Sequence, residues 1–249
     1  MPAYPTAMRL LVSVSSAHEA SAALAGGADI VDAKNPLAGP LGPVTADVFG
    51  EIHAAVAGLR LVTAALGDVV READTERAAV AFCSAGAALV KIGFSGISDP
   101  RRVEALTAAA VRGAQAGRSG ATGVVAVAYA DAERVGSLPA TRFVDLAARA
   151  GASGLLLDTA DKAGPGLRGL ISADALAEWV GEAHDAGLLV ALAGKLGPDD
   201  LAFVRDAGAD IAGVRGAACE KSRIGRVSVS RVAVLRACCG SAEAGQYVR

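Results

Sequence analysis

The sequence predicts an α/β fold: one closed barrel of eight parallel strands, each followed by a helix. Short apolar runs alternate with longer, alanine-rich amphipathic stretches along the chain, and there are eight such pairs. Glycine turns recur directly before several of the apolar runs. The chain has 249 residues, 53% of them hydrophobic, which suits a single large core. These observations match the size and strand count of a (β/α)8 TIM barrel.

The expected strands are continuous apolar runs, because a parallel sheet covered by helices is buried on both faces. They lie at residues 9–14, 29–34, 59–64, 89–93, 123–129, 154–158, 188–193 and 210–214. The expected helices are the longer segments between and after them, where apolar and polar residues alternate at helical spacing. They lie at residues 18–25, 45–57, 74–85, 100–116, 139–150, 172–186, 199–207 and 228–238.

Glycines punctuate the junctions between an expected helix and the next strand. Gly27, Gly86, Gly151 and Gly208 stand at such junctions, where a left-handed residue ends a helix. Junctions of this kind lie at the bottom of a barrel, so we assign them to stability rather than chemistry. An open, doubly wound sheet is the alternative architecture. It would need a glycine-rich nucleotide fingerprint after the first strand, and residues 12–16 contain none.

Composition excludes several classes of function. The net charge is −2 and the isoelectric point is about 5.9, so no basic field attracts nucleic acid or acidic membranes. The N-terminus lacks a signal-peptide pattern, and no uncharged apolar run approaches the roughly 20 residues of a membrane span. The four cysteines and three histidines lack zinc-site spacing. We expect a cytoplasmic protein without metal or cofactor.

We expect one catalytic domain at residues 9–239, preceded by an extension at residues 1–8 and followed by a disordered tail at residues 240–249. Alanine-rich helices on its exterior favour a homo-oligomer.

Two expected strands end in an amine. Asp32 and Lys34 are two residues apart and therefore project from the same face of the second strand, and Lys91 lies in the fourth. Burial disfavours an ammonium ion and lowers its pKa toward the range where a neutral amine attacks a carbonyl carbon. These residues point to a Schiff-base or proton-transfer site. The alternative is an ion pair that only plugs the end of the core.

Other polar residues follow the remaining strands, whose C-terminal ends meet at one rim of a barrel. They are Tyr129 and Asp131 after the fifth strand, Asp158 and Lys162 after the sixth, Lys195 after the seventh and Arg215 after the eighth. Three carboxylates of this rim could in principle gather around Mg²⁺, but the lysines would repel it.

The expected phosphate site lies after the seventh and eighth strands. Gly194 and Gly216 let the backbone approach an anion, the N–H group of Ala217 can point at it, and Arg215 adds a bidentate donor. The glycine-containing loop at residues 39–42 is either a second anion pocket, a lid or a plain surface loop.

Five short sequence strings, taken together and in this order, resemble the (5-formylfuran-3-yl)methyl phosphate synthase family. The likeness extends from about residue 10 to residue 235. The strings are GADIVDAKNP at 27–36, YADA at 129–132, LDTA at 157–160, ALAG at 191–194 and GVRGAAC at 213–219.

The resemblance implies a TIM-barrel lyase with class I aldolase-like chemistry. Such enzymes convert two molecules of glyceraldehyde 3-phosphate into 4-(hydroxymethyl)-2-furancarboxaldehyde phosphate, with loss of phosphate and water. Lys34 matches the family's Schiff-base lysine and Asp32 its neighbouring acid. Lys91 matches the lysine of the fourth strand, and Asp158 and Lys162 match the acid and lysine after the sixth.

The chemistry implied by the resemblance gives these residues roles. An imine at Lys34 would promote enolisation, while Asp32 or Asp158, with Lys91 or Lys162, would share the proton transfers. Two substrate phosphates need a second basic group, for which Lys162 or Lys195 are candidates.

The chain departs from the family's usual pattern at Pro40, at Lys195 and at residues 94–96. We expect these departures to affect how substrate is bound more than which class of reaction is catalysed. Two other functions stay open: a different Schiff-base phosphosugar aldolase or isomerase, and a protein that only binds a phosphorylated metabolite.

Overall fold

A computed structural model describes residues 8–117 and 122–240 of the chain. The expected N-terminal extension and C-terminal tail lie outside these residues, apart from Met8 and Gly240 at their edges. Met8, which the expected extension includes, is buried in the core.

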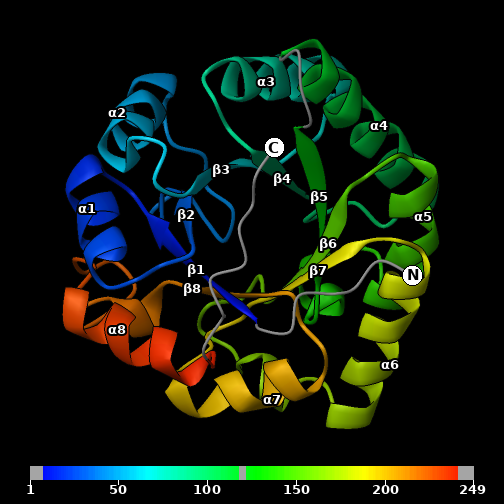
Figure 1. Cartoon of the computed structure of the whole chain (residues 1–249). Coiled ribbons are helices and arrows are strands. Elements are labelled where there is room, and N and C mark those ends of the chain that lie inside the picture. Colours follow the sequence, from blue (N-terminus) through cyan, green and yellow to red (C-terminus); the bar gives the residue numbers. More distant parts are fainter. Residues whose placement is uncertain (1–7, 118–121, 241–249) are drawn as a thin grey trace.

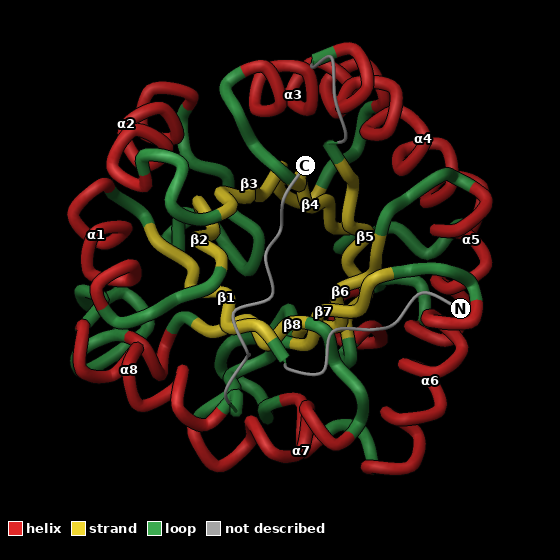
Figure 2. Tube along the Cα trace, in the orientation of Figure 1, coloured by secondary structure: helices red, strands yellow, loops and turns green. Residues whose placement is uncertain are grey.

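Eight parallel strands close into a barrel in the order β1 to β8, and β1 pairs with β8 (Figures 1 and 2). The predicted (β/α)8 fold is confirmed. The strands are β1 (Arg9–Val14), β2 (Ile30–Ala33), β3 (Leu61–Asp68), β4 (Leu89–Gly93), β5 (Gly123–Tyr129), β6 (Gly154–Asp158), β7 (Leu189–Leu192) and β8 (Ile211–Val214).

The helices form a ring around the barrel (Figure 2). They are α1 (Ala17–Ala25), α2 (Ala46–Val56), α3 (Glu72–Ser84), α4 (Pro100–Ala116), α5 (Phe143–Arg149), α6 (Ala173–Asp185), α7 (Leu201–Asp206) and α8 (Val229–Cys238). Side chains of Ser16, Thr45, Asp99 and Ser172 accept N–H groups of the first turns of α1, α2, α4 and α6, which fixes where these helices begin. In the described part of the chain, no helix has both the length and the apolarity needed to cross a membrane.

Two hydrophobic clusters result from the alternation of side chains along the strands. The larger cluster joins the outer face of the barrel to the helices, and includes Val12, Val31 and Phe49. The smaller one fills the barrel interior with Leu11, Ile30, Val125, Val127, Leu156, Ala191 and Ile211. Polar side chains point inward two residues further along several of these strands. The barrel interior therefore has a polar layer above an apolar one.

Strand β3 is longer than the expected 59–64. Its pairing with β4 shifts between Ala65 and Gly67, and Gly67 has a positive φ of 92°, which glycine accommodates without steric cost. The irregularity lets the strand continue to Asp68 and brings that carboxylate to the barrel mouth. Sequence periodicity does not show such a bulge.

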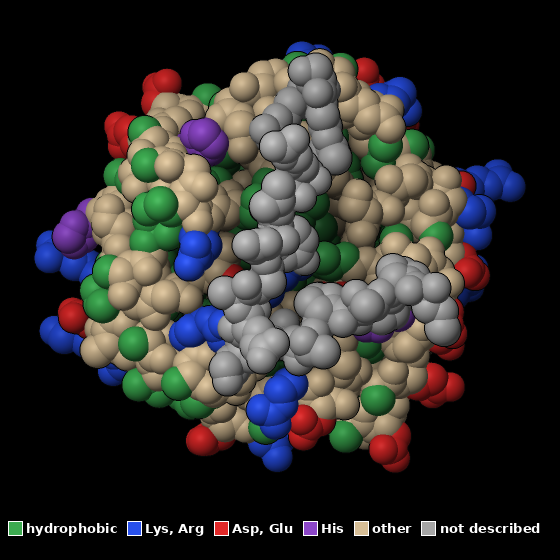
Figure 3. All heavy atoms as spheres, viewed as in Figure 1, with side chains coloured by type: hydrophobic (Ala, Val, Ile, Leu, Met, Phe, Trp, Pro, Cys, Tyr) green, Lys and Arg blue, Asp and Glu red, His purple; other side chains and the backbone are tan. Residues whose placement is uncertain are grey.

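Figure 3 shows one face of the molecule, with Asp and Glu side chains mainly around the periphery and Lys and Arg side chains scattered between them. Where this face is not covered by grey atoms, the described residues form no large area of a single charge.

Candidate active site

A cavity of about 290 Å³ opens among the C-terminal ends of the strands. Of the predicted site residues, it is lined by Lys34, Lys91, Asp158, Lys162, Gly194, Lys195, Arg215, Gly216 and Ala217. Asp32 lies directly beneath it and is fully buried. Tyr129 and Asp131 do not line it. The strand ends therefore bring together most of the residues that the sequence singled out.

Asp32 forms a buried ion pair with Lys91. The distance from Nζ of Lys91 to Oδ1 of Asp32 is 2.5 Å, and Oγ1 of Thr63 donates to the same oxygen at 2.7 Å. Oγ of Ser13 donates to Oδ2 at 2.9 Å. Burial alone would raise the pKa of Asp32, but the nearby ammonium groups and these hydrogen bonds hold it below its ordinary value. Asp32 is therefore an anion that is fixed in place by three contacts.

Asp158 pairs with Lys162, four residues further along the chain, at a distance of 2.9 Å. The backbone N–H of Thr159 donates to the same carboxylate oxygen at 2.7 Å, and Lys162 also donates to the carbonyl oxygen of Thr159. Burial opposes ionisation of Asp158, yet Lys162 and Lys34 keep its pKa below the ordinary value. Unlike Asp32, this carboxylate faces the cavity.

Lys34 lies between these two ion pairs and continues the ladder of β2, since its backbone N–H donates to the carbonyl oxygen of Val14. Within residues 8–117 and 122–240, Nζ of Lys34 has no hydrogen-bond or ion-pair partner. Burial is the main cause of a lowered pKa, to about 8. The carboxylates of Asp158 and Asp32 oppose this shift, and the ammonium groups of Lys91 and Lys162 add to it.

A lysine with a pKa of about 8 is neutral far more often than an ordinary lysine. At pH 7 about one molecule in ten carries the free amine, against roughly three in ten thousand for a pKa of 10.5. The surroundings thus distinguish the two lysines. Lys91 is occupied by its contact with Asp32, whereas the amine of Lys34 is suited to nucleophilic attack.

Loops after β7 and β8 supply backbone donors to the other end of the cavity. Gly194 has a φ of 106°, and a Cβ atom there would lie 3.0 Å from Cγ2 of Thr159, so this turn favours glycine. In the described residues, no group accepts from the backbone N–H groups of Lys195, Leu196 or Ala217, all of which line the cavity. Free N–H groups at these loops are suited to bind an oxyanion.

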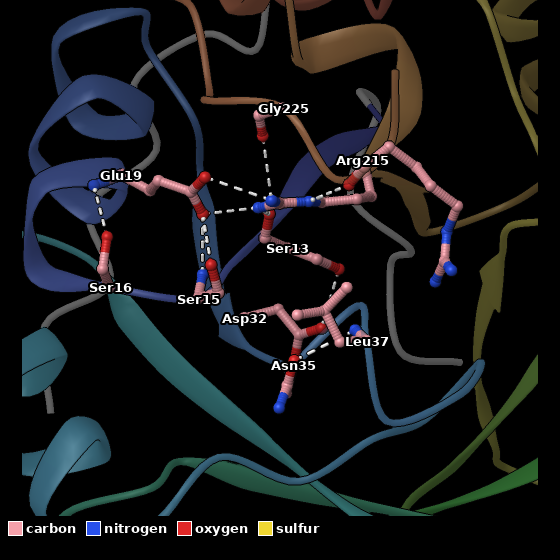
Figure 4. A network of polar contacts seen from close by, with 10 residues as sticks. Ser13, Ser15, Ser16, Glu19, Asp32, Asn35, Leu37, Arg215 and Gly225 are labelled. Carbon is pink, nitrogen blue, oxygen red and sulfur yellow. Dashed lines mark hydrogen bonds and ion pairs between the residues drawn. The ribbon is translucent and has the colours of Figure 1, made fainter.

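Arg215 lines the same end, but the protein occupies its guanidinium (Figure 4). It donates five hydrogen bonds: to both carboxylate oxygens of Glu19 and to the carbonyl oxygens of Ser13, Arg223 and Gly225. An arginine has five N–H donors, so none is left for a ligand in this arrangement. Burial opposes ionisation of Glu19, but Arg215 and Ser15 lower its pKa.

Tyr129 and Asp131 support the site from outside the cavity. The hydroxyl of buried Tyr129 donates to Oδ1 of Asp68 at 2.7 Å, and burial together with this carboxylate raises the pKa of the phenol. Asp131 accepts from the backbone N–H groups of Ala160 and Asp161 at 2.8 and 2.7 Å. It therefore fixes the loop that carries Lys162, rather than offering its oxygens to a ligand.

The loop at residues 39–42 does not line the cavity, and it is not wholly a surface loop. Leu41 is buried inside the barrel mouth with Tyr129 and Ala65. The backbone N–H of Asn35 donates to the carbonyl oxygen of Gly42, which closes the loop on itself.

Four side chains of the site escaped the sequence reasoning: Ser13, Thr63, Glu19 and Arg223. The first two could have been found by strand parity, because each shares a face with inward-directed neighbours. Nothing local marks the other two. In the part of the chain that the structure describes, no three His, Cys, Asp or Glu side chains gather as a metal site would require.

A family model described as 4-HFC-P synthase matches residues 10–236. Curated relatives cover a similar span. The (5-formylfuran-3-yl)methyl phosphate synthase of Methanopyrus kandleri is 41% identical over 215 residues, which is 86% of this chain and 90% of that protein. The protein of the same name from Methanocaldococcus jannaschii is 39% identical over 214 residues, 86% of this chain and 91% of that protein.

Solved structures similar to this chain share its fold. A 3-hexulose-6-phosphate synthase has a TM-score of 0.64 at 23% identity, covering 93% of this chain and 99% of that one. A phosphoribosyl anthranilate isomerase from Thermus thermophilus has a TM-score of 0.60 at 16% identity, covering 93% and 98%. At such identities these likenesses concern the barrel alone.

Proposed function

The chain belongs to the (5-formylfuran-3-yl)methyl phosphate synthase family, and we propose that it condenses two molecules of glyceraldehyde 3-phosphate through a Schiff base at Lys34. The product is 4-(hydroxymethyl)-2-furancarboxaldehyde phosphate, a synonym of the furan phosphate in the family name. One phosphate and two waters leave from the two substrates. Loss of phosphate breaks a carbon–oxygen bond, which makes the enzyme a carbon–oxygen lyase.

The amine of Lys34 is the observation that carries this proposal. It lies in the cavity, lacks a partner among the described residues and has a pKa of about 8. Attack of its lone pair on the aldehyde carbon and loss of water give an imine. Once protonated, the imine draws electrons from the neighbouring carbon and acidifies its proton.

Asp158 is the base that suits this proton. It faces the cavity, stays ionised beside Lys162 and lies near enough to Lys34 to affect its pKa. The resulting enamine expels the phosphate of the same triose from C3, with cleavage of the carbon–oxygen bond. The C3 carbon of the enol that forms then attacks the ketone carbon of the second triose phosphate, which proton transfers of the same kind have isomerised from the aldehyde. The Lys91 ammonium, held by Asp32, is placed to protonate the new alkoxide.

The two phosphates need two anion sites. Backbone N–H groups of the loops after β7 and β8 suit one of them, and Lys162 or Lys195 is available for the other. The free hydroxyl of the second triose then attacks the C2 carbonyl carbon of the first and closes the ring. Loss of two waters makes the ring aromatic, and hydrolysis of the imine releases the aldehyde and Lys34. Such eliminations proceed through the same kind of proton transfers as enolisation.

Product analysis tests the proposal. Purified protein incubated with glyceraldehyde 3-phosphate alone should release inorganic phosphate and form an aldehyde with strong ultraviolet absorption, whose mass matches the furan phosphate. A non-aromatic sugar phosphate in its place would indicate another Schiff-base aldolase or isomerase. Unchanged triose phosphate would contradict the proposal.

A further inference from the structure

Half of the cations of the cavity wall are already paired with a carboxylate. The wall contains six: Lys34, Lys91, Lys162, Lys195, Arg215 and Arg223. Asp32, Asp158 and Glu19 neutralise three of them, at distances of 2.5 to 2.9 Å. The proposed reaction uses the amine of Lys34. A phosphate at the loops after β7 and β8 is therefore left with Lys195 or Arg223 as its cation.

We infer that Arg223 is the side chain that binds the substrate phosphate at the β7–β8 end of the cavity, and that Arg215 is a positioning residue that holds Arg223 there. This inference rests on the proposed function, since it names the ligand of the phosphate that the substrate brings.

Arg223 lies beside the backbone that forms the phosphate site. It belongs to the segment between η5 (Gly216–Ala218) and α8, and its Cβ lies only 3.7 Å from where a Cβ of Gly216 would be. Its side chain is half-buried and lines the cavity together with Gly216 and Ala217. A guanidinium at this place can complement the N–H groups of both loops.

The guanidinium of Arg223 contacts only carbonyl oxygens among the described residues, and some of its N–H donors have no acceptor. Nη1 donates to the carbonyl oxygen of Pro36 at 2.9 Å, and Nη2 makes only a long contact, 3.5 Å, with that of Gly39. Among the described residues, no acceptor faces its Nε and no carboxylate pairs with it. An arginine held by carbonyl oxygens can exchange a weak bond for a charge-assisted one to phosphate.

Arg215 fixes the backbone of this segment on both sides of Ile224. Its Nε donates to the carbonyl oxygen of Arg223 at 2.9 Å, and its Nη2 donates to that of Gly225 at 3.1 Å. Glu19 on α1 in turn grips Arg215 with both carboxylate oxygens (Figure 4). The buried pair thus acts on a ligand through the position of Arg223.

Lys195 is the weaker candidate for this phosphate. Its side chain is exposed and donates to the carbonyl oxygen of Gly164 at 2.5 Å, which ties it to the loop after β6. That position suits the other end of the substrate pair.

Binding of inorganic phosphate to the whole protein, measured by calorimetry, tests the inference. Arg223→Gln should weaken binding about 10- to 100-fold, the size expected for loss of a charge-assisted contact. The phosphate affinity of Arg223→Lys should lie between those of the wild-type protein and Arg223→Gln, because the ammonium is a point charge in place of the planar guanidinium. Arg226→Gln is the matched control: it removes the same charge three residues along, at an exposed site, and should change the affinity less than about twofold.

Unchanged affinity in Arg223→Gln, with or without a lower melting temperature, would overturn the inference. If that variant does not fold, Arg223→Lys decides, and unchanged affinity there has the same meaning. A further outcome is that the wild-type protein forms no furan while the Arg223→Gln variant loses phosphate binding. In that case the proposed function fails and the inference stands.

A double-mutant cycle separates positioning from direct binding. Arg215→Lys should weaken phosphate binding several-fold in the wild-type background and have no further effect in the Arg223→Gln background. Equal weakening in both backgrounds would mean that Arg215 contacts the phosphate itself, which would overturn its positioning role.

Discussion

The two halves of the barrel mouth share one backbone plan and differ in the size of the side chains directed inward. On the side of β7 and β8 these are Ala191, Ala193 and Gly213, which leave the cavity open. On the side of β5 they are Val127 and Tyr129, and Leu41 from the loop after β2 fills the remaining space. Side-chain size therefore decides which half of the mouth is open, and Lys34 and Lys91 stand at the edge of this open half.

The largest expected loss of activity comes from substitution of Lys34, at the edge of the open half. Lys34→Ala should lower kcat/KM for glyceraldehyde 3-phosphate by at least about a thousandfold, because no other amine of the described residues near the cavity floor is free to form the imine. Release of phosphate and ultraviolet absorbance of the product measure it. Circular dichroism controls for folding. A residual activity of a tenth or more would remove Lys34 from the nucleophile role.

Filling the open half should have the next largest effect. Ala191→Leu puts a branched side chain into the cavity and should lower kcat/KM about a hundredfold, mainly through KM. Steady-state kinetics measure this, and Ala191→Ser, which adds a single oxygen atom, is the control. Wild-type kinetics in the leucine variant would show that substrate binds elsewhere.

The pH dependence of imine formation should follow the amine of Lys34. Its pKa is lowered to about 8, so the neutral form grows as the pH rises, and the rate should increase about tenfold from pH 6 to pH 7 and level off above pH 8. Stopped-flow trapping of the imine measures this rate.

Lys162→Met sharpens the same measurement. It removes a like charge that lowers the pKa of Lys34, so the plateau should move to higher pH. A wild-type rate that keeps rising beyond pH 9 would contradict the lowered pKa.

The smallest effect should come from the closed half. Tyr129→Phe removes the hydrogen bond to Asp68, which keeps its bond from the backbone N–H of Ser95. The free energy of unfolding should fall by about 1 kcal/mol, as for one side-chain hydrogen bond, while kcat/KM stays within about threefold. Urea unfolding and kinetics measure the two quantities. A loss of activity near that of Ala191→Leu would mean that the closed half also contacts substrate.

The convergence of Lys34, Lys91, Asp158 and Lys162 could be predicted from sequence, because parallel strands in a barrel end at one rim and alternate residues share a face. The same two rules place Asp32 beneath them. Strand and helix positions follow from apolar runs and glycine junctions, with errors where a bulge or a short 3₁₀ turn intervenes, as in β3 and before α5 and α7.

The partners of the rim residues could not be predicted in this way. Glu19 lies 196 residues from Arg215, and their pairing depends on how α1 packs against β1 and α8. The same holds for Arg223, which reads locally as one basic residue in an exposed segment. Distances between side chains across the rim decide which cation is paired with a carboxylate and which is free. Spacing along the chain does not show these distances.

Reductive trapping tests the account most directly. Protein incubated with glyceraldehyde 3-phosphate and borohydride should gain the mass of a reduced triose phosphate, and peptide mapping should find it on Lys34. An adduct on Lys91, or none in a protein that forms the furan, would contradict the central role of Lys34.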